Sequence, residues 1–196
     1  MNSIPKQEIL RKVLHILASI IPISLIWFPY DTYFFSFFLF IIIGIGIFLE
    51  YGRWHIRWLK MFFYYLNFMM RNKELNGGFT GATWLLIGCF FSVIFFPKDI
   101  SIVSMLFLTI GDTFAAIIGI AFPLGKYKGK TISGSIGGFS LAGIVILCFI
   151  DNFDPTILIV GVIFSMLIEM LPIPINDNLT IPIFSGFGMV LTSYIL

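Results

Sequence analysis

A single acidic side chain interrupts one of the longest apolar stretches of the sequence, where a charge is costly. Asp112 lies about midway along the otherwise uncharged segment 100–122, and a carboxylate inside a membrane-spanning helix needs a partner or water. Ala115, Ala116 and Gly119 follow at helical spacing and place small side chains on the same face. The pattern favours a functional carboxylate with space beside it. The alternative is close helix packing, with Asp112 bonded to a nearby Ser or Thr.

The segment that follows, 125–135, alternates glycine with lysine and ends in hydroxyl residues. Free backbone N–H groups, ammonium groups and hydroxyls are donors that bind phosphate oxygens. The segment is not a P-loop, because three residues rather than four separate Gly125 from Gly129. We expect a nucleotide or phosphate site here, and the alternative is an ordinary positively charged cytoplasmic loop. The candidate ligands are Lys126, Lys128, Gly129, Lys130, Thr131, Ser133, Gly134 and Ser135.

Two further groups of charged residues lie near the ends of apolar stretches. Arg11 and His15 are four residues apart and Lys12 is three before His15, so a helix gathers these cations on one face. Glu50 and Arg53, three residues apart, have the spacing of an ion pair on a helix. Each group either serves only as an orienting or structural feature or holds a charged headgroup.

Carboxylates and amides surround the last turn-rich segment of the chain. Glu169 precedes this segment and Asp177 lies within it, and both are predicted to lie toward the cytoplasmic leaflet, as is Asp112. Hard oxygen ligands suit Mg²⁺ that is shared with nucleotide phosphates, so these three residues are candidate metal ligands. Asn176, Asp177 or Asn178 is expected to cap the next helix, which requires only one of them.

The composition indicates that these residues do not belong to a soluble protein. The chain has 196 residues and a mean hydropathy of +1.02, with 59% hydrophobic and 11% charged residues, which excludes a soluble globular domain and a disordered tail. The net charge of +2 is too small for binding to a phosphate backbone, so we expect no nucleic-acid partner. Cys89 and Cys148 lie in apolar stretches, which indicates neither a disulfide framework nor a zinc site.

The uncharged stretches predict an all-α fold, a polytopic transmembrane bundle of about seven spans in one domain that covers residues 1–196. The predicted spans are 13–28, 33–49, 79–96, 100–122, 135–150, 156–171 and 179–196. With the N-terminus in the cytoplasm, eleven of the twelve Lys and Arg residues fall on that side and only Lys98 on the other. We therefore expect a multi-pass protein of the cell membrane whose active face is cytoplasmic.

Polar residues between the second and third spans recur at steps of four and three, from Arg53 to Arg71. Trp54, Trp58 and Phe62 are among the apolar residues of the opposite face. This pattern predicts one amphipathic helix in the membrane interface, with its basic face toward water and headgroups. Such a helix either anchors the topology alone or also binds an anionic headgroup or nucleotide.

Several short motifs occur in a fixed order along the chain. They are Arg11-Lys12-x-x-His15, Glu50-x-x-Arg53, Thr80-Gly81-Ala82-Thr83, Gly111-Asp112-x-x-Ala115 with Gly119, Lys130-Thr131-x-Ser133-Gly134-Ser135, and Glu169 followed by Asn176-Asp177-Asn178. Together they resemble the polyprenol kinase family, which includes dolichol kinase, phytol kinase and CTP-dependent diacylglycerol kinase and is related to phosphatidate cytidylyltransferases. The resemblance runs from Arg11 to about Gly186, and the segment Pro123-Leu124-Gly125 departs from the family pattern.

The resemblance implies a lipid kinase that transfers the terminal phosphate of CTP, or of another nucleoside triphosphate, to a membrane lipid alcohol such as diacylglycerol or a polyprenol. It implies Mg²⁺ as cofactor, and as partners the lipid alcohol, the nucleotide and the bilayer. By the resemblance, the catalytic residues are Asp112, Asp177, Arg11, Lys12, His15, Glu50 and Arg53, the nucleotide ligands include Asn176 and Asn178 beside the loop residues named above, and the metal ligands are Asp112, Glu169 and Asp177.

Two other activities fit parts of the same pattern. A phosphatidate cytidylyltransferase leaves pyrophosphate and a CDP-lipid, whereas a kinase leaves CDP and a lipid phosphate. A small ion-coupled transporter would use Asp112 to carry protons or ions, but the sequence has no second broken or charged span in a matching half. The sequence indicates neither an oligomeric state nor a particular lipid.

Overall fold

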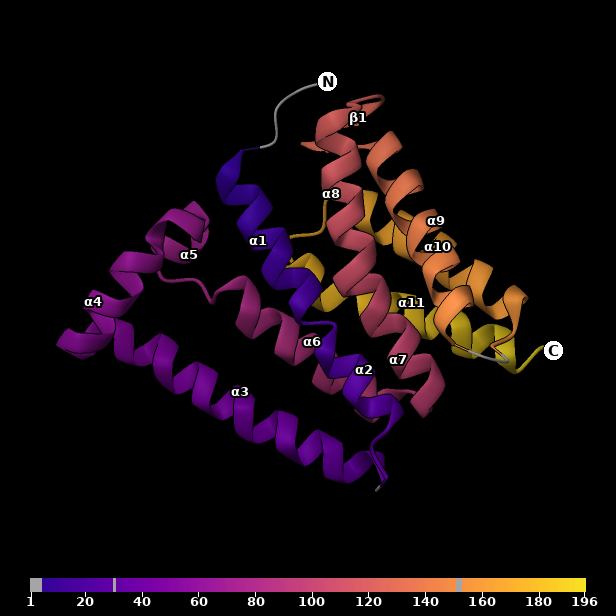
Figure 1. Ribbon diagram of the computed structural model, residues 1–196, viewed down its shortest axis with the longest axis horizontal. Helices are drawn as coiled ribbons and strands as arrows, with labels where there is room; N and C mark the ends of the chain where they lie inside the picture. Colours follow the sequence, from indigo (N-terminus) through magenta and orange to yellow (C-terminus); the bar gives the residue numbers. More distant parts are fainter. Residues whose placement is uncertain (1–4, 30, 151–152) are drawn as a thin grey trace.

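The computed structural model describes residues 5–29, 31–150 and 153–196, and its elements are almost all helices (Figure 1). The first part comprises α1 (Lys6–Leu17), α2 (Ile20–Ile26), α3 (Thr32–His55), α4 (Arg57–Leu66), the 3₁₀ turn η1 (Asn67–Met69) and α5 (Asn72–Leu75). The central part comprises α6 (Gly81–Phe95), α7 (Lys98–Leu106), the π-helical turn η2 (Phe107–Gly111) and α8 (Asp112–Ala121). The last part comprises β1 (Lys126–Tyr127), β2 (Lys130–Thr131), α9 (Ile132–Phe149), α10 (Pro155–Met170) and α11 (Asp177–Ser193). The predicted all-α fold is confirmed.

Four helical segments are long and apolar enough to cross a membrane: Lys6–Ile26, Thr32–His55, Lys98–Ala121 and Ile132–Phe149. The apolar helices α6 and α10 are shorter, with 15 and 16 residues. Helix α3 exposes a run of large side chains such as Phe34, Phe37 and Phe40, which water-soluble proteins bury. The protein is therefore a membrane protein, and the count of seven spans stays a prediction.

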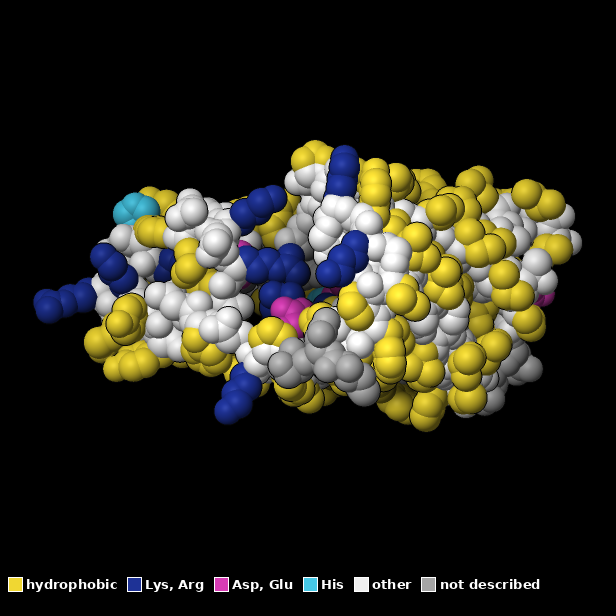
Figure 2. Space-filling model, turned by 90° about the horizontal axis from the view of Figure 1, so that it is seen from above, with side chains coloured by type: hydrophobic (Ala, Val, Ile, Leu, Met, Phe, Trp, Pro, Cys, Tyr) yellow, Lys and Arg dark blue, Asp and Glu magenta, His cyan; other side chains and the backbone are white. Residues whose placement is uncertain are grey.

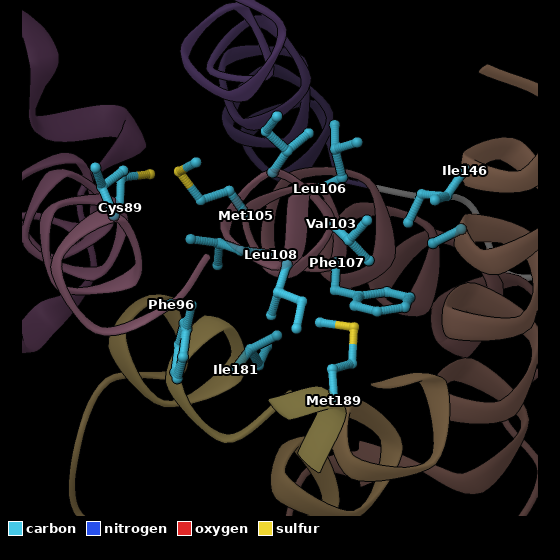
Figure 3. Packing of buried hydrophobic residues seen from close by; sticks show 14 of the residues in the cluster. Cys89, Phe96, Val103, Met105, Leu106, Phe107, Leu108, Ile146, Ile181 and Met189 are labelled. Carbon is cyan, nitrogen blue, oxygen red and sulfur yellow. The ribbon is translucent and has the colours of Figure 1, made fainter. Parts of the chain in front are cut away.

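The segment formed by α7, η2 and α8 lies at the centre of the bundle, with α9 packed along one side (Figure 1). Its side chains dominate the hydrophobic core, where Val103, Met105, Phe107 and Leu108 are completely buried (Figure 3). Ile181 and Met189 of α11 extend the same core cluster (Figure 3). This packing fixes the position of the helix that carries Asp112.

Helix α9 packs against the small side chains that follow Asp112. A Cβ added at Gly134 would lie 2.5 Å from the carbonyl oxygen of Ala115, and one added at Gly138 would meet the backbone nitrogen of Ala115. Glycine at these positions permits close helix approach, as small residues do in membrane bundles. The small-residue face is therefore covered by α9, and the space expected beside the carboxylate is a cavity that other helices line together with Asp112.

The interfacial amphipathic helix begins later than the sequence pattern predicts. Helix α3 continues to His55, and the extended backbone of Ile56 separates it from α4. Arg53 therefore lies in the last turn of α3, where it is buried, and not on the interfacial helix. The spacing of polar residues continues across Ile56, because a helix break of one residue does not interrupt the pattern in the sequence. The spacing alone therefore does not reveal where α3 ends and α4 begins.

Candidate active site

Lys12 of α1 and Asp112 of α8 form an ion pair between helices that are distant in sequence. The Lys12 ammonium donates to Oδ2 of Asp112 at 2.5 Å and to the backbone oxygen of Asp112 at 3.0 Å. Lys12 is only 4% exposed, so the pair lies where little water screens the two charges. The partner of Asp112 is thus a lysine and not the Ser or Thr of the packing alternative.

His15 lies one helical turn after Lys12 and faces the same carboxylate. Its Nδ1 is 3.5 Å from Oδ2 of Asp112, and its side chain is mostly buried. Among the residues that the structure describes, this Nδ1 has no hydrogen-bond partner. Arg11 lies beside this group but forms its ion pair with Glu8, at 2.5 Å. Lys12 and His15 are therefore the basic side chains of α1 that contact Asp112 directly.

Arg71 adds a further positive charge to the site. The sequence pattern placed this residue only at the end of the polar face of the predicted amphipathic helix. It lies at the turn before α5, close enough to interact electrostatically with both Asp112 and His15. Seen from the end of the molecule that carries α1 and the β-hairpin, Lys and Arg side chains gather near the middle with acidic side chains beside them (Figure 2). The end of a polar stripe was the signal that could have identified Arg71.

A cavity of about 700 Å³ opens beside the Lys12–Asp112 pair, between α1 and α2 on one side and α3, α4 and α6 on the other. Its polar end is lined by Arg11, Lys12, His15, Glu50, Arg71, Glu74, Thr80, Thr83, Asp112 and Asn178. The remaining wall is mostly apolar and includes Leu14, Ile21, Leu49 and Leu85. The cavity therefore combines a charged end with a long hydrocarbon wall, which is the polarity of a lipid.

Glu50 and Arg53 pair at 3.1 Å, and both are 5% exposed. Oε1 of Glu50 accepts hydrogen bonds from the Thr80 backbone N–H at 2.8 Å and from the Thr83 hydroxyl at 3.0 Å. Arg53 donates to the backbone oxygens of Glu74 and Gly78, at 2.8 and 2.7 Å. The predicted ion pair is present, and its contacts hold the segment between α5 and α6 against α3.

Glu74 is a buried carboxylate that the sequence analysis did not single out. It accepts from the backbone N–H groups of Arg71 and Gly81, both at 3.1 Å, and so closes the segment 71–81 on itself. Asn178 of α11 donates to the backbone oxygen of Gly81 at 2.7 Å and lines the cavity. Asn176 caps α11 by accepting from the Asn178 N–H at 3.0 Å, as one of the three candidates was expected to do.

The remaining predicted acidic residues form a second cluster around Lys130. Its ammonium donates to both oxygens of Asp177 at 3.0 Å and to the backbone oxygen of Glu169, while the Ser135 hydroxyl donates to Glu169. Glu169 also interacts electrostatically with Asp112. The two clusters are therefore neighbours, joined through Glu169 and through the adjacent residues of α11.

Residues 126–131 of the glycine- and lysine-rich segment form a β-hairpin. Lys126 pairs with Thr131 and Tyr127 with Lys130, and the turn residues Lys128 and Gly129 both have positive φ, as a tight hairpin turn requires. The N–H groups at 132 and 133 donate to Gly125 and Leu124. The backbone N–H groups expected to be free for phosphate are thus largely paired.

Several side chains of this segment are also engaged locally. The Thr131 hydroxyl accepts from the Gly134 N–H and caps α9, and the Ser133 hydroxyl donates to the backbone oxygen of Phe122. Lys126 and Lys128 are exposed, and the Lys128 ammonium lies 5.7 Å from the centre of the Tyr127 ring. In the described part of the chain, residues 125–135 do not line the cavity that contains Asp112.

The candidate metal ligands divide between the two clusters. Asp112 pairs with Lys12, whereas Asp177 pairs with Lys130 and the Glu169 carboxylate accepts from the Ser135 hydroxyl. Within the described ranges, no three His, Cys, Asp or Glu side chains are arranged to hold a metal ion. Mg²⁺ commonly takes one or two carboxylates, with phosphate and water as its other ligands, so Glu169 and Asp177 fit such a site together with a nucleotide.

The chain is similar along nearly its whole length to a bacterial protein, the uncharacterized protein RP860 of Rickettsia prowazekii, with 32% identity over 195 residues and 95% of each chain covered. The uncharacterized protein MJ1137 of Methanocaldococcus jannaschii is 31% identical over 150 residues, which cover 75% of this chain and 74% of that protein. No family model matches the chain, and no solved structure matches it significantly.

A shorter match connects the chain to enzymes. CTP-dependent diacylglycerol kinase 1 of Saccharomyces cerevisiae is 34% identical over 90 residues, which are 44% of this chain and 31% of the yeast protein. The match spans about a third of the yeast enzyme's length, so it supports a kinase relationship and leaves the substrate to be determined. The chain therefore belongs to the same family as the Rickettsia and Methanocaldococcus proteins, and its partial similarity to diacylglycerol kinases supports a kinase-related family.

Proposed function

We propose that the protein is a lipid kinase that transfers the terminal phosphate of a nucleoside triphosphate, with CTP as the expected donor, to the hydroxyl of a membrane lipid alcohol. The observation that carries this proposal is the buried Lys12–Asp112 pair, with His15 beside it, at the polar end of an apolar cavity of about 700 Å³. A lipid alcohol combines one reactive polar group with hydrocarbon, and this cavity offers the matching surfaces. We place the reaction at the cytoplasmic face of the cell membrane.

In the proposed reaction, the lipid hydroxyl lies beside Asp112 and His15. Nδ1 of His15 lies 3.5 Å from Asp112 without a hydrogen bond to it, and in the reaction it would donate to this carboxylate, which leaves Nε2 to accept the hydroxyl proton. The hydroxyl oxygen forms a bond to the terminal phosphorus, and the bond from that phosphorus to the bridging oxygen breaks, releasing the nucleoside diphosphate. Lys12 and Arg71 stabilise the negative charge on the transferring group.

The nucleotide is proposed to bind on the side of Asp112 where Lys130 lies. Lys130 would exchange its contact with Asp177 for a phosphate oxygen, which frees the Asp177 carboxylate. Glu169 and Asp177 would then hold Mg²⁺, which neutralises phosphate charge during transfer. The exposed Lys126 and Lys128 are placed to attract the nucleotide by charge, since neither has an ion-pair partner in the described residues.

The test is an assay of the purified full chain with labelled CTP, ATP or UTP, Mg²⁺, and a panel of diacylglycerol, polyprenols and phytol. We expect labelled lipid phosphate with at least one alcohol, and loss of this product in Asp112→Asn. Asp99→Asn is the matched control, because Asp99 is an exposed carboxylate in the first turn of the same helical segment. Transfer to no alcohol, or full activity of Asp112→Asn, would contradict the proposal.

A further inference from the structure

The apolar part of the cavity is elongated along the helices that form it. Leu14, Ala18 and Ile21 line it from α1 and α2 at helical spacing, and Gly46 and Leu49 line it from α3. The cavity therefore extends from the charged end into the hydrocarbon depth of the bundle.

Small residues keep this passage open on its two sides. A Cβ added at Gly46 would have the Thr83 hydroxyl as its nearest neighbour, at 3.8 Å, which is an ordinary contact. Ala18 lines the opposite wall, beside the joint between α1 and α2. A larger side chain at Gly46 would thus enter the cavity without first displacing backbone.

The polar end offers hydrogen-bond acceptors to a hydroxyl head. Asp112, Glu50 and Glu74 line this end together with the cations of Lys12, Arg11 and Arg71, and carboxylates accept hydrogen bonds from a hydroxyl. Lys12 and Arg53 are already paired with two of these carboxylates. A single-chain alcohol satisfies both the polar end and the apolar passage.

We propose that the apolar passage binds one hydrocarbon chain of the acceptor alcohol, and that Gly46 and Ala18 determine the chain length that it accepts. The identity of the bound group as an acceptor rests on the proposed function, whereas chain binding itself does not. A second chain, where the lipid has one, lies outside the cavity against the exposed apolar faces of the bundle. A single-chain alcohol is therefore sufficient for binding at this site.

The first experiment measures binding without nucleotide. A diazirine-bearing hexadecanol is crosslinked to the purified full chain, and hexadecanol or decanol is added as competitor. We expect crosslinks at cavity residues and stronger competition by hexadecanol. In Gly46→Leu, the affinity for hexadecanol is expected to fall about tenfold, the effect of excluding about two methylene groups, while that for decanol changes less. Ala18→Leu is expected to act in the same direction from the opposite wall.

Gly44→Leu is the matched control. Gly44 lies two residues from Gly46 on the same helix, is exposed, and has no atom within 4 Å of an added Cβ. The same substitution there is expected to leave hexadecanol binding unchanged. The proposal would be overturned if the ratio of the affinities for hexadecanol and decanol were the same in Gly46→Leu, Gly44→Leu and the unchanged protein. Crosslinks confined to the outer face of α3 would also overturn it.

The second experiment separates this inference from the proposed function. Phosphorylation of hexadecanol, decanol and the panel of diacylglycerol, polyprenols and phytol is measured for the same variants. Chain-selective binding that Gly46→Leu weakens, without phosphorylation of any alcohol, supports the chain site and contradicts the kinase. Phosphorylation whose chain preference is the same in Gly46→Leu and Gly44→Leu supports the kinase and overturns the chain site.

Discussion

At the scale of single residues, the candidate site depends on the pairing of Lys12 with Asp112. Each charge would be costly alone in this buried place, and each is tolerated because the other lies 2.5 Å away. Asp112 also faces Nδ1 of His15, so one carboxylate organises two basic side chains of α1. The chemistry and the packing of α1 against α8 therefore share the same residues.

The pair predicts a specific pattern of stability among three variants. Lys12→Met and Asp112→Asn each leave one buried charge unpaired, which we expect to cost about 3–5 kcal/mol of unfolding free energy. The double variant removes both charges and is expected to be less destabilised than the sum of the single changes. All three should lack lipid phosphorylation. Unfolding of the detergent-solubilised protein measures the effect, and strictly additive costs would contradict the buried pair.

The sequence identified most members of the site but not their partners. Asp112, Lys12, His15, Glu50 and Arg53 stand out as charges within or beside apolar stretches. Which charge meets which depends on helix packing across as many as 100 residues, and spacing carries no information about it. Arg71 and Glu74 were missed because they lie in a polar segment of the sequence, so neither stands out as an isolated charge beside an apolar stretch.

At the scale of elements, the π-helical turn η2 connects the core helix α7 to Asp112. Thr109 in this turn is completely buried, and its hydroxyl accepts from the Ser19 hydroxyl at 2.7 Å and donates to the backbone oxygen of Met105. Ser19 lies at the joint between α1 and α2. The Ser19–Thr109 bond thus fixes the register of α1 against the segment that carries Asp112, and π-turns often occur at functional sites.

Thr109→Val therefore tests whether this register matters for activity. Valine keeps the shape and removes the hydroxyl, so we expect kcat to fall about tenfold, equivalent to about 1.4 kcal/mol, with KM for the nucleotide unchanged. Thr109→Ser retains the hydroxyl and should restore most of kcat. A change confined to protein yield, or a Thr109→Ser variant as impaired as Thr109→Val, would show that the hydroxyl has no positioning role.

The contact between α8 and α9 gives a prediction about helix packing. A Cβ at Gly138 would meet the backbone of Ala115, so Gly138→Ala must push the helices apart, at a cost of about 1–3 kcal/mol. Gly44→Ala is the control, because an added Cβ there meets nothing within 4 Å. Thermal unfolding is expected to show a lower midpoint only for Gly138→Ala. An unchanged midpoint in that variant would contradict the close packing.

Helix positions were more predictable than the backbone of the connecting segments. Long uncharged runs identify helices such as α3 and α9, because crossing a membrane demands them. The segment 125–135 was expected to offer free backbone N–H groups to phosphate, yet it contains a hairpin with Lys128 and Gly129 at its turn. The break at Ile56 was also missed, since nothing in its residue type differs from a continuing helix.

At the scale of the whole molecule, the charged residues indicate that the two ends of the bundle face opposite sides of the membrane. The Lys98 ammonium donates to backbone oxygens of Ile26 and Phe28 at one end, whereas the hairpin with Lys128 lies at the other end, near the first helix (Figure 1). The sequence predicted this separation from the seven expected spans together with the distribution of positive charge. The sidedness itself stays a prediction that labelling can test.

Single cysteines at these two positions provide the test. In a background with Cys89→Ala and Cys148→Ser, Lys98→Cys and Lys128→Cys are labelled with a membrane-impermeant maleimide in right-side-out and inverted vesicles. We expect Lys128→Cys to react from the cytoplasmic side and Lys98→Cys from the other side. Reaction of both from one side would contradict the predicted number of spans between them.

The central claim for the whole molecule is that one lipid alcohol and one nucleotide meet at Asp112, and the fate of the nucleotide phosphates tests it most directly. Purified protein is supplied with Mg²⁺, with a lipid alcohol or, in a parallel reaction, phosphatidate, and with CTP labelled in either its terminal or its innermost phosphate. A kinase places the terminal label in the lipid and leaves the innermost label in CDP, and we predict this result. Innermost label in the lipid, with release of pyrophosphate, would contradict the account.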